Sequence, residues 1–336
     1  MPAGDKMLDA KYRILELLKS EGSDFLSGEF ICQQLQVSRT AIWKNIKALR
    51  RDGYQIEARP RAGYRLVSAP DSLLPTEWQP GLASQLIGRQ ARYFKATGST
   101  NDVAKDLARQ GAAEGTVVVA EEQTTGRGRL GRVWQSPAQA GLYFSVILYP
   151  MVSPMEVTQV TLLAAVAVVR ALARELGVTA RVKWPNDVYL NGCKICGILA
   201  EMAAEADRVK YLVVGIGVNV NQGQEDFAAL GSTASSLKLQ VGYRVNRAAI
   251  LRAILEELDQ LYALWQTEGF ASLRSLWKDV ALWLGYSVLV SGGQRNWQGT
   301  MEDIDESGAL VLRMPDGTIK KFYSGEVSLR LKTQQV

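Results

Sequence analysis

GRGRLGR at 126–132 and KWPND at 183–187 are the stretches from which the fold of this 336-residue chain follows. The first alternates glycine with arginine, so backbone N–H groups and guanidinium forks can close together on one anion. It lies between two β-rich runs, Thr116–Glu122 and Leu142–Tyr149, and is therefore expected on a loop between strands. A basic, glycine-rich turn is also typical of an ordinary surface loop. The second stretch and the residues after it favour an anion site.

The central region mixes long helices with hairpin-like strands. Helices are expected at Asn101–Gln110, Met155–Leu176 and Arg247–Trp265, and strands at Arg181–Trp184, Lys194–Met202 and Val209–Val220. Ser99 or Thr100 is a candidate cap for the first helix. This mixture predicts an α+β domain built on a mixed sheet.

The N-terminal residues predict a small separate unit of three helices and a two-stranded hairpin. These elements are expected at 8–18, 27–35, 38–51, 54–58 and 64–67. Ser38 is the N-cap candidate for the third helix. Helix, helix-turn-helix and hairpin in this order make a winged helix-turn-helix.

Positive charge gathers in the third helix and the hairpin. Between Ser38 and Arg65 there are eight Lys or Arg residues and two acidic residues, a net charge of +6, whereas the whole chain carries +5. A cationic helix and wing suit contacts to DNA phosphates. A solvated basic face on a protein-docking domain is the alternative, and we favour DNA. The expected DNA contacts are Ser38, Arg39, Thr40, Trp43, Lys44, Lys47, Arg59 and Arg61.

Two further regions complete the predicted α+β multidomain chain. Residues 67–81 contain three of the ten prolines and little periodicity, which is typical of a linker. From Ala281 onward, short strands separated by turns such as Gly292-Gly293 and Asp316-Gly317 predict a small β-barrel of the SH3 type. The predicted division is a DNA-binding domain at 1–68, a linker at 69–84, the α+β domain at 85–275 and the barrel at 276–336.

The sequence contains no histidine, and this limits the chemistry that is open to it. Ser-His-Asp and Cys-His nucleophilic sites and His-ligated metals are excluded. Cys193 and Cys196 have C-x-x-C spacing but lie within an expected strand, so we favour two incidental thiols over a redox or zinc site. Catalysis must then rest on positioning, on carboxylates and on Lys/Arg electrostatics.

Apolar runs are short. The longest within the central helix, Leu162–Val169, is well below the roughly 20 residues that span a bilayer. The N-terminus is polar and has no signal peptide. We therefore expect a cytoplasmic protein with no membrane partner.

With three further stretches, the two motifs resemble those of the biotin protein ligases. The additional stretches are Gly98-Ser99-Thr100-Asn101, Glu121-Glu122-Gln123-Thr124 and Gly215-Ile216-Gly217-Val218-Asn219. They occur in the family's order, from about residue 85 to the C-terminus. The N-terminal unit resembles that of the bifunctional members, which also repress biotin operons. The resemblance implies a ligase domain of the biotin/lipoate type, similar to class II aminoacyl-tRNA synthetases, and the Gly/Arg-rich loop favours biotin over lipoate.

The resemblance also implies roles for individual residues. Arg129, Lys194, Lys183 and Asp187 are the expected catalytic residues, and Asp187 is a candidate Mg²⁺ ligand. The expected biotin contacts are Ser99, Thr100, Asn101, Gln123, Arg127, Gly128, Arg129, Lys194, Gly197 and Gly217. The expected nucleotide contacts are Arg127, Arg129, Arg132, Trp134, Asn186 and Asn219. Trp134 either covers the ligand or belongs to the core.

The activity implied is formation of biotinyl-5′-AMP from biotin and MgATP, followed by transfer of biotin to a lysine of the biotin carboxyl carrier protein of acetyl-CoA carboxylase. The retained adenylate is expected to promote a homodimer, through a sheet edge, that occupies biotin operator DNA. Two alternatives stay open: a biotin ligase whose winged helix does not repress, and a ligand-sensing transcription factor without ligase activity.

Overall fold

The structure is a computed structural model that describes residues 3–205, 208–228, 233–292, 295–324 and 327–331. The chain divides into two units, Met1–Pro80 and Gly81–Val336. The expected turn at Gly292-Gly293 lies partly outside the described residues.

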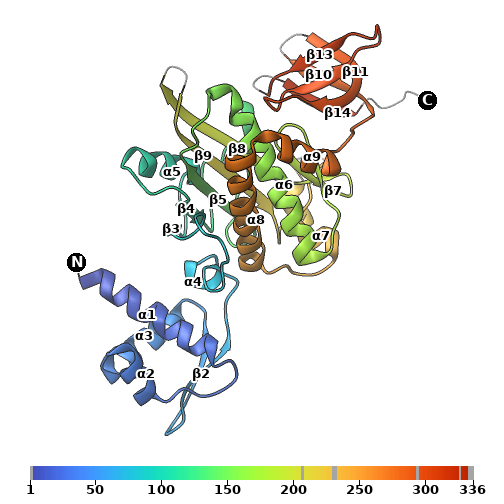
Figure 1. Cartoon of the computed structure of the whole chain (residues 1–336). Helices are drawn as coiled ribbons and strands as arrows, with labels where there is room; N and C mark the ends of the chain where they lie inside the picture. The colour runs from blue at the N-terminus through green and yellow to red at the C-terminus, as the bar shows by residue number, and fades with distance from the viewer. Residues whose placement is uncertain (1–2, 206–207, 229–232, 293–294, 325–326, 332–336) are drawn as a thin grey trace. The chain divides into compact units, whose positions relative to one another are not determined.

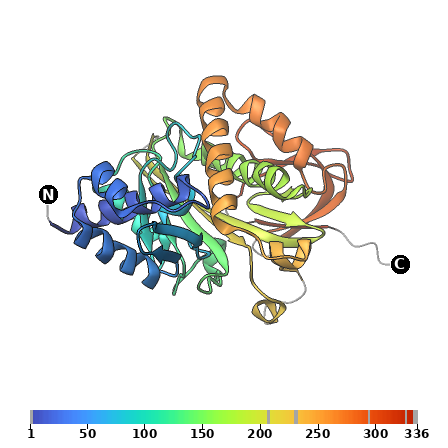
Figure 2. The same cartoon turned by 90° about the horizontal axis from the view of Figure 1, so that it is seen from below.

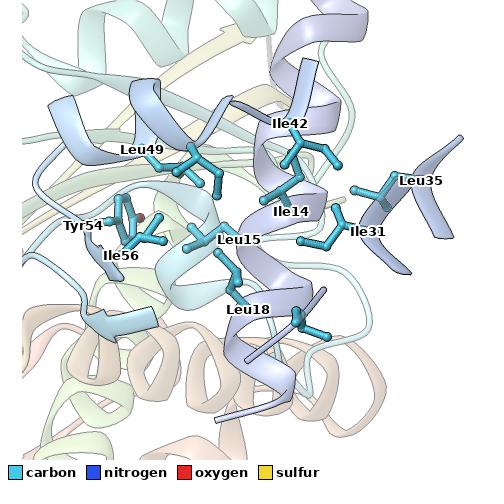
Figure 3. Packing of buried hydrophobic residues seen from close by; sticks show 11 residues of the cluster. Ile14, Leu15, Leu18, Ile31, Leu35, Ile42, Leu49, Tyr54 and Ile56 are labelled. Carbon is cyan, nitrogen blue, oxygen red and sulfur yellow. The ribbon is translucent and has the colours of Figure 1, made fainter. Parts of the chain in front are cut away.

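The first unit contains the predicted three helices and hairpin. Its elements are α1 (Ala3–Ser20), α2 (Gly28–Leu35), α3 (Arg39–Arg51), β1 (Gln55–Arg59) and β2 (Gly63–Ser68). The Ser38 side chain accepts a hydrogen bond from the N–H of Ala41, which confirms the predicted cap of α3. Figure 3 shows Leu15 and Leu18 of α1 packed with Ile42 and Leu49 of α3 in the small core of this unit.

A glycine fixes the position of the hairpin. Gly63 has φ of 111°, and a Cβ there would lie 1.8 Å from the Leu26 carbonyl oxygen. Only glycine tolerates that conformation and that approach. The close contact allows Leu26 and Tyr64 to exchange two backbone hydrogen bonds of 2.8 Å. The wing is thereby tied to the residues just before α2.

The segment expected as a linker contains a short helix, α4 (Pro75–Trp78), that packs on the first unit. Glu77 lies 2.8 Å from Lys19 of α1 and accepts a hydrogen bond from the Tyr54 hydroxyl. The Trp78 side chain is fully buried, and its indole N–H donates to the Leu73 carbonyl. Ordered packing thus extends to the end of this unit.

The second unit is built on a seven-stranded mixed sheet of order β3-β4-β5-β9-β8-β7-β6. Its strands are β3 (Ala91–Phe94), β4 (Val117–Ala120), β5 (Gly141–Leu148), β6 (Arg181–Lys183), β7 (Asp187–Leu190), β8 (Cys193–Glu205) and β9 (Arg208–Asn219). Only β3 and β4 pair in parallel among the described ladders of this sheet. The α+β class predicted for this region is confirmed.

Helices cover the sheet. They are α5 (Thr100–Arg109), α6 (Val157–Leu176), α7 (Leu237–Val241), α8 (Arg247–Glu268) and α9 (Phe270–Val280), with short 3₁₀ turns at Arg129–Gly131, Pro154–Glu156 and Gln224–Phe227. Helix α5 packs on Val118, Ile147 and Val213 of the sheet. Figure 1 and Figure 2 both place α6 beside α8, in agreement with their extensive contact.

The segment Pro154–Leu176, which includes α6, is long and apolar enough to cross a membrane by length and composition. However, 72% of its apolar window is buried inside the protein. It packs on α8, α9 and β8, and the indole N–H of Trp265 donates to its buried Gln159. These contacts are those of a core helix, for which the same length and composition are ordinary.

The chain ends in a five-stranded antiparallel sheet of order β13-β12-β11-β10-β14. The strands are β10 (Ser287–Gly292), β11 (Arg295–Ile304), β12 (Leu310–Arg313), β13 (Ile319–Phe322) and β14 (Val327–Leu331). The indole N–H of Trp184 donates to the Gly308 carbonyl and the Gln159 amide to the Glu306 carbonyl, so the turn between β11 and β12 is held by α6 and by the connection between β6 and β7.

Asp259 of α8 anchors the first residues of the second unit. Its carboxylate is 8% exposed and accepts backbone N–H groups of Gln85, Leu86 and Ile87 at 2.7, 3.0 and 2.8 Å. Three consecutive backbone donors, of which that of Ile87 is buried, thus share one charged acceptor.

We predict that Asp259→Asn destabilises the second unit by about 2 kcal/mol, because an amide offers one neutral oxygen where the carboxylate offers two charged ones. Hydrogen exchange at residues 85–87 should accelerate, as read by mass spectrometry or NMR. Asp106→Asn, at a site whose side chain is 64% exposed, is the matched control. Unchanged exchange in Asp259→Asn would contradict the anchoring role.

Candidate active site

A cavity of about 690 Å³ opens in the second unit, beside the start of α5. Its lining comes from the start of α5, the loop 123–137, the segment 183–187 and strands β5, β7, β8, β9 and β14, with further residues from the turns between elements. Every catalytic, biotin and nucleotide residue expected from the sequence lies in this lining. The fold therefore gathers residues as distant in sequence as Ser99 and Asn219 around one space.

The floor of the cavity is a pair of glycines. Gly197 of β8 faces Gly217 of β9 across the ladder. A Cβ would lie 2.9 Å from the Trp134 ring at Gly197 and 2.5 Å from its Nε1 at Gly217. The glycines were expected to let a flat ring approach the sheet, and in this structure the flat ring is the indole of Trp134. Its N–H is buried with no hydrogen-bond partner among the described residues.

Lys194 lies beside this indole, whereas Lys183 lies over the rings of Tyr189 and Trp283. Lys194 Nζ lies 5.3 Å from the centroid of the Trp134 ring and 2.7 Å from Asp187 Oδ1. Burial lowers the pKa of Lys183 below its ordinary value; Asp187 opposes this shift, and nearby cations, including Lys194 and Arg330, add to it. The cavity therefore holds more positive charge than its carboxylates neutralise, which favours an anionic ligand.

Arg129 crosses from the loop to two other parts of the unit. It donates to Asn186 Oδ1 at 2.9 Å and to the backbone carbonyl of Ser324 in the C-terminal sheet. Burial lowers the pKa of its guanidinium. Asn186 is held in turn, because its amide donates to the Ile198 carbonyl at 2.9 Å.

The other two arginines of the loop, Arg127 and Arg132, are more exposed than Arg129. Arg127 pairs with Asp102 of α5 at 2.5 Å, and both side chains are more than 40% exposed. Arg132 is exposed, and its carbonyl accepts the N–H of Gly128 at 2.7 Å, which closes the loop. The three arginines thus line one cavity but only Arg129 is substantially buried.

The start of α5 supplies neutral polar groups. Thr100 donates from its backbone N–H and its hydroxyl to Gln123 Oε1, at 2.8 and 3.1 Å. The expectation that Ser99 or Thr100 caps this helix is wrong: Ser99 occupies the cap position but makes no side-chain capping bond. The backbone N–H of Thr100 is bound by Gln123 instead, because Gln123 follows the end of β4 and lies beside the start of the helix. Asn101 donates to Leu199 O and to Glu201 of β8.

The two neighbouring cysteines lie on β8, as expected. Burial raises the pKa of the Cys196 thiol, which keeps it protonated and unreactive. Within the described residues, no three Cys, Asp or Glu side chains come together as a metal site. Asp187, the candidate Mg²⁺ ligand, is paired with Lys194.

In the first unit, the residues expected to contact DNA are solvent-exposed and belong to α3, its N-cap and the hairpin. Ile42, Ile46 and Leu49 face the core, whereas Trp43 is 55% exposed and Lys47 Nζ lies 5.1 Å from its ring centroid. The remaining expected residues are also exposed: Ser38, Arg39, Thr40, Lys44, Arg59 and Arg61.

Comparison with known proteins assigns a family to each part of the chain. Residues 93–219 match the model of the Biotin/lipoate A/B protein ligase family, residues 11–65 an HTH domain and residues 284–330 the Biotin protein ligase C terminal domain. The Bifunctional ligase/repressor BirA of Bacillus spizizenii is 41% identical over 94% of this chain and 97% of its own length. The chain belongs to the bifunctional ligase/repressor family.

Other members of the family are similar over most of their length. The Escherichia coli ligase/repressor is 32% identical over 91% of this chain and 94% of its own. A biotin protein ligase from Aquifex aeolicus, solved in complex with biotin and ATP, is 31% identical with a TM-score of 0.63, and the match covers 73% of this chain and 100% of that one. The fold and family expected from the sequence are confirmed.

Several cavity residues carry no recognisable signal in the sequence. Arg330 and Leu329 come from β14, and Trp283 from the turn before the C-terminal sheet. Arg330 is close enough to Lys183 to lower the lysine's pKa. Gln222 and Phe227 follow β9 without any recognisable motif. The packing of the C-terminal sheet and of residues 221–228 brings these side chains to the site.

We predict that ATP binding is accompanied by uptake of a proton on Lys183, between its pKa in the free protein and its pKa in the complex. Burial lowers the pKa of Lys183 in the free protein, and a bound phosphate raises it, so between the two values only the complex holds the proton. Affinity should fall as pH rises through that window. Calorimetry in two buffers of different ionisation enthalpy measures the uptake. Equal uptake by Lys183→Met would assign it to another group.

Proposed function

We infer that this chain is a biotin–protein ligase that also represses transcription in response to biotin. It forms biotinyl-5′-AMP and pyrophosphate from biotin and ATP, then transfers biotin to a lysine of a biotin carboxyl carrier protein. The observation that carries this proposal is the cluster of Arg129, Lys183 and Lys194 beside the glycine floor, in a chain of the ligase/repressor family.

The first step needs cations and no base. The biotin carboxylate is ionised at neutral pH, and one of its oxygens attacks the α-phosphorus while the bond to pyrophosphate breaks. The obstacle is repulsion between two anions. Lys194 and Arg129 hold the two together, and Lys183 adds a point charge. This is chemistry that a chain without histidine can perform.

The second step breaks the mixed anhydride. The ε-amine of the carrier lysine attacks the acyl carbon, an amide bond forms, AMP leaves and the amine loses its proton. The same cations stabilise AMP as it departs. Gln123 and the Thr100 and Asn101 side chains at the start of α5 offer donors and acceptors to the ureido ring of biotin.

Mg²⁺ fits this site as part of MgATP. The ion takes one or two carboxylates together with substrate phosphates and water, rather than a protein cage. Among the described residues of the lining, the carboxylates are Asp187 and Asp226. Asp187 would hold the ion and supply, through it, further neutralisation of the phosphates.

The repressor half of the proposal uses the first unit. Arg39, Lys44 and Lys47 of α3 and the arginines of the wing contact operator phosphates, and exposed Trp43 and Thr40 lie toward the bases. The retained adenylate promotes a homodimer that forms through an edge of the large sheet. The protein acts in the cytoplasm. The described edges of that sheet are β3 and β6.

We predict that Arg129→Ala and Lys194→Ala each lower the rate of biotinyl-5′-AMP formation about 100- to 1000-fold, the usual cost of removing one donor to a developing charge. Arg129→Lys should rescue only in part, because lysine lacks the bidentate fork. Arg127→Ala should cost far less, since Arg127 forms an exposed pair with Asp102.

Pyrophosphate release in the presence of biotin measures these rates. Arg109→Ala, whose side chain is 62% exposed on the far end of α5, is the control. Wild-type rates in both the Arg129 and Lys194 variants would sink the assignment of the reacting centre.

We predict that a protein beginning at Gly81 keeps adenylate formation and loses operator binding, because the cavity lies in 81–336 and the basic face in 1–80. Full-length protein should bind the operator more tightly with biotinyl-5′-AMP, since a dimer engages two half-sites, and its affinity should fall steeply with salt.

Gel shifts across salt and adenylate concentration, with carrier biotinylation measured in parallel, decide the matter. Operator binding that ignores the adenylate would leave a ligase without repressor function. DNA binding without any adenylate formation would instead favour a pure transcription factor.

A further inference from the structure

Two aromatic rings face the ammonium group of Lys183. Its Nζ lies 5.1 Å from the ring centroid of Tyr189 and 5.4 Å from that of Trp283, and it donates to the Tyr189 hydroxyl at 3.2 Å. Both aromatic residues line the ligand cavity, as the lysine does. Asp187, which lies opposite Lys183 in the β6–β7 ladder, forms its ion pair with Lys194. Among the described residues, the close partners of this cation are therefore two rings and a hydroxyl.

Backbone pairing places Trp283 beside the lysine. Ala281 forms a parallel bridge with Val182 of β6, and the N–H of Leu282 donates to the Val182 carbonyl at 2.7 Å. Lys183 is the next residue of β6. The segment that joins α9 to β10 thus runs along this strand, and the pairing fixes the distance from the indole to the ammonium group.

The backbone of Trp283 adopts a conformation that is rare for a bulky residue. Its φ is 71°, in the left-handed region that favours glycine and asparagine. The turn is closed by the N–H of Tyr286, which donates to the Trp283 carbonyl at 3.0 Å. Residues held in this region cost free energy and cluster at functional sites. Because glycine or asparagine would suit this backbone better, the contacts of the ring, rather than the turn, account for a tryptophan at this position.

An aromatic ring can hold a cation without neutralising it. The face of the ring attracts the ammonium group through its quadrupole, and the attraction is stronger where water is excluded. Lys183 is half-buried, and burial lowers its pKa, so it is the charged form that needs stabilisation. A carboxylate partner would stabilise the ammonium group too, but it would cancel the charge. Two ring faces keep the lysine in place and leave its full charge for a phosphate.

We propose that Trp283 and Tyr189 form an aromatic cage that holds the Lys183 ammonium group at the wall of the cavity, where it meets the phosphates of the nucleotide. This rests on the proposed ligase activity. Trp283 and Tyr189 are positioning residues, because they act on the nucleotide through the lysine. The cage also joins two parts of the second unit, since Tyr189 belongs to β7 and Trp283 to the segment before β10.

The first test removes the indole and follows ATP and biotin separately. We expect Trp283→Leu and Trp283→Asn each to lower kcat/KM for ATP in adenylate formation about 10-fold and to leave the KM for biotin unchanged. Trp283→Phe keeps a ring face and should recover most of the loss. Asparagine suits the left-handed backbone, so Trp283→Asn preserves the turn even if leucine distorts it.

A matched control comes from the C-terminal sheet. Trp297 of β11 also faces a lysine, with Lys320 Nζ at 4.7 Å from its ring centroid, but it lies outside the cavity lining. Trp297→Leu should therefore leave kcat/KM for ATP unchanged. On the second ring of the cage, Tyr189→Phe keeps the aromatic face and should cost less than Tyr189→Leu.

The second test asks whether the indole acts through the lysine. Calorimetry compares the affinity for ATP of the wild type, Trp283→Asn, Lys183→Met and the double variant. Trp283→Asn should weaken ATP binding in the wild-type background and cause no further loss in Lys183→Met, because no cation is left to hold.

Each outcome decides for or against the cage. Wild-type values in both Trp283→Leu and Trp283→Asn overturn it, as does a Trp283→Phe variant no better than leucine. An equal loss of ATP affinity with and without Lys183 also overturns it, because the indole would then act on the nucleotide or the fold directly. If the wild type makes no adenylate from biotin and ATP, the proposed ligase activity fails, and the four ATP affinities still test the cage by themselves.

Discussion

Repulsion among half-buried cations is the constraint around which the second unit is organised. Lys183, Lys194, Arg129 and Arg330 approach one cavity, and burial already disfavours the charged form of Lys183. Asp187 neutralises part of this charge through its contact with Lys194. The carboxylates of such a cavity neutralise only part of its positive charge, and a bound anion neutralises the rest. Its electrostatics thus favour binding phosphate and carboxylate together, which is the demand of the proposed reaction.

The cations can lie close to one another because the strands beneath them carry glycines, which have no side chains. Gly197 and Gly217 face each other next to the end of the β8–β9 ladder and have no side chains, and the Trp134 indole lies against them. The tryptophan carries the end of the Gly/Arg loop down to the sheet, and Arg129 ties the same loop to Ser324. Loop, large sheet and C-terminal sheet are therefore joined at the site, so the C-terminal strands contribute to the chemistry as well as to the fold.

Much of this could be predicted from the sequence, where local signals were strong. The Ser38 cap, the apolar face of α3 and the motif residues of the cavity follow from spacing and from short motifs. The rest depends on contacts between distant segments. Arg330 reaches the cavity only because β14 pairs with β10, and Gln123 replaces Ser99 as the cap of α5 only because β4 ends beside that helix. No local pattern encodes such pairings, and so Gln222 could not be distinguished from any other loop glutamine.

The Gly/Arg loop is held on its solvent side by weak contacts. On its cavity side, stronger contacts become possible when an anion binds. The Arg127–Asp102 pair is exposed on both sides, so it contributes about 0–1 kcal/mol. A charge-assisted contact from a half-buried group such as Arg129 to a bound anion is worth about 1.5–3 kcal/mol. The contact to the anion is therefore worth more than the surface ion pair. An anion in the cavity can draw the loop inward even if the Arg127–Asp102 pair is lost. In the proposed cycle, closure over the adenylate is therefore favourable. The loop is released once the biotinyl group has passed to the carrier lysine and AMP, the remaining anion, leaves for solvent.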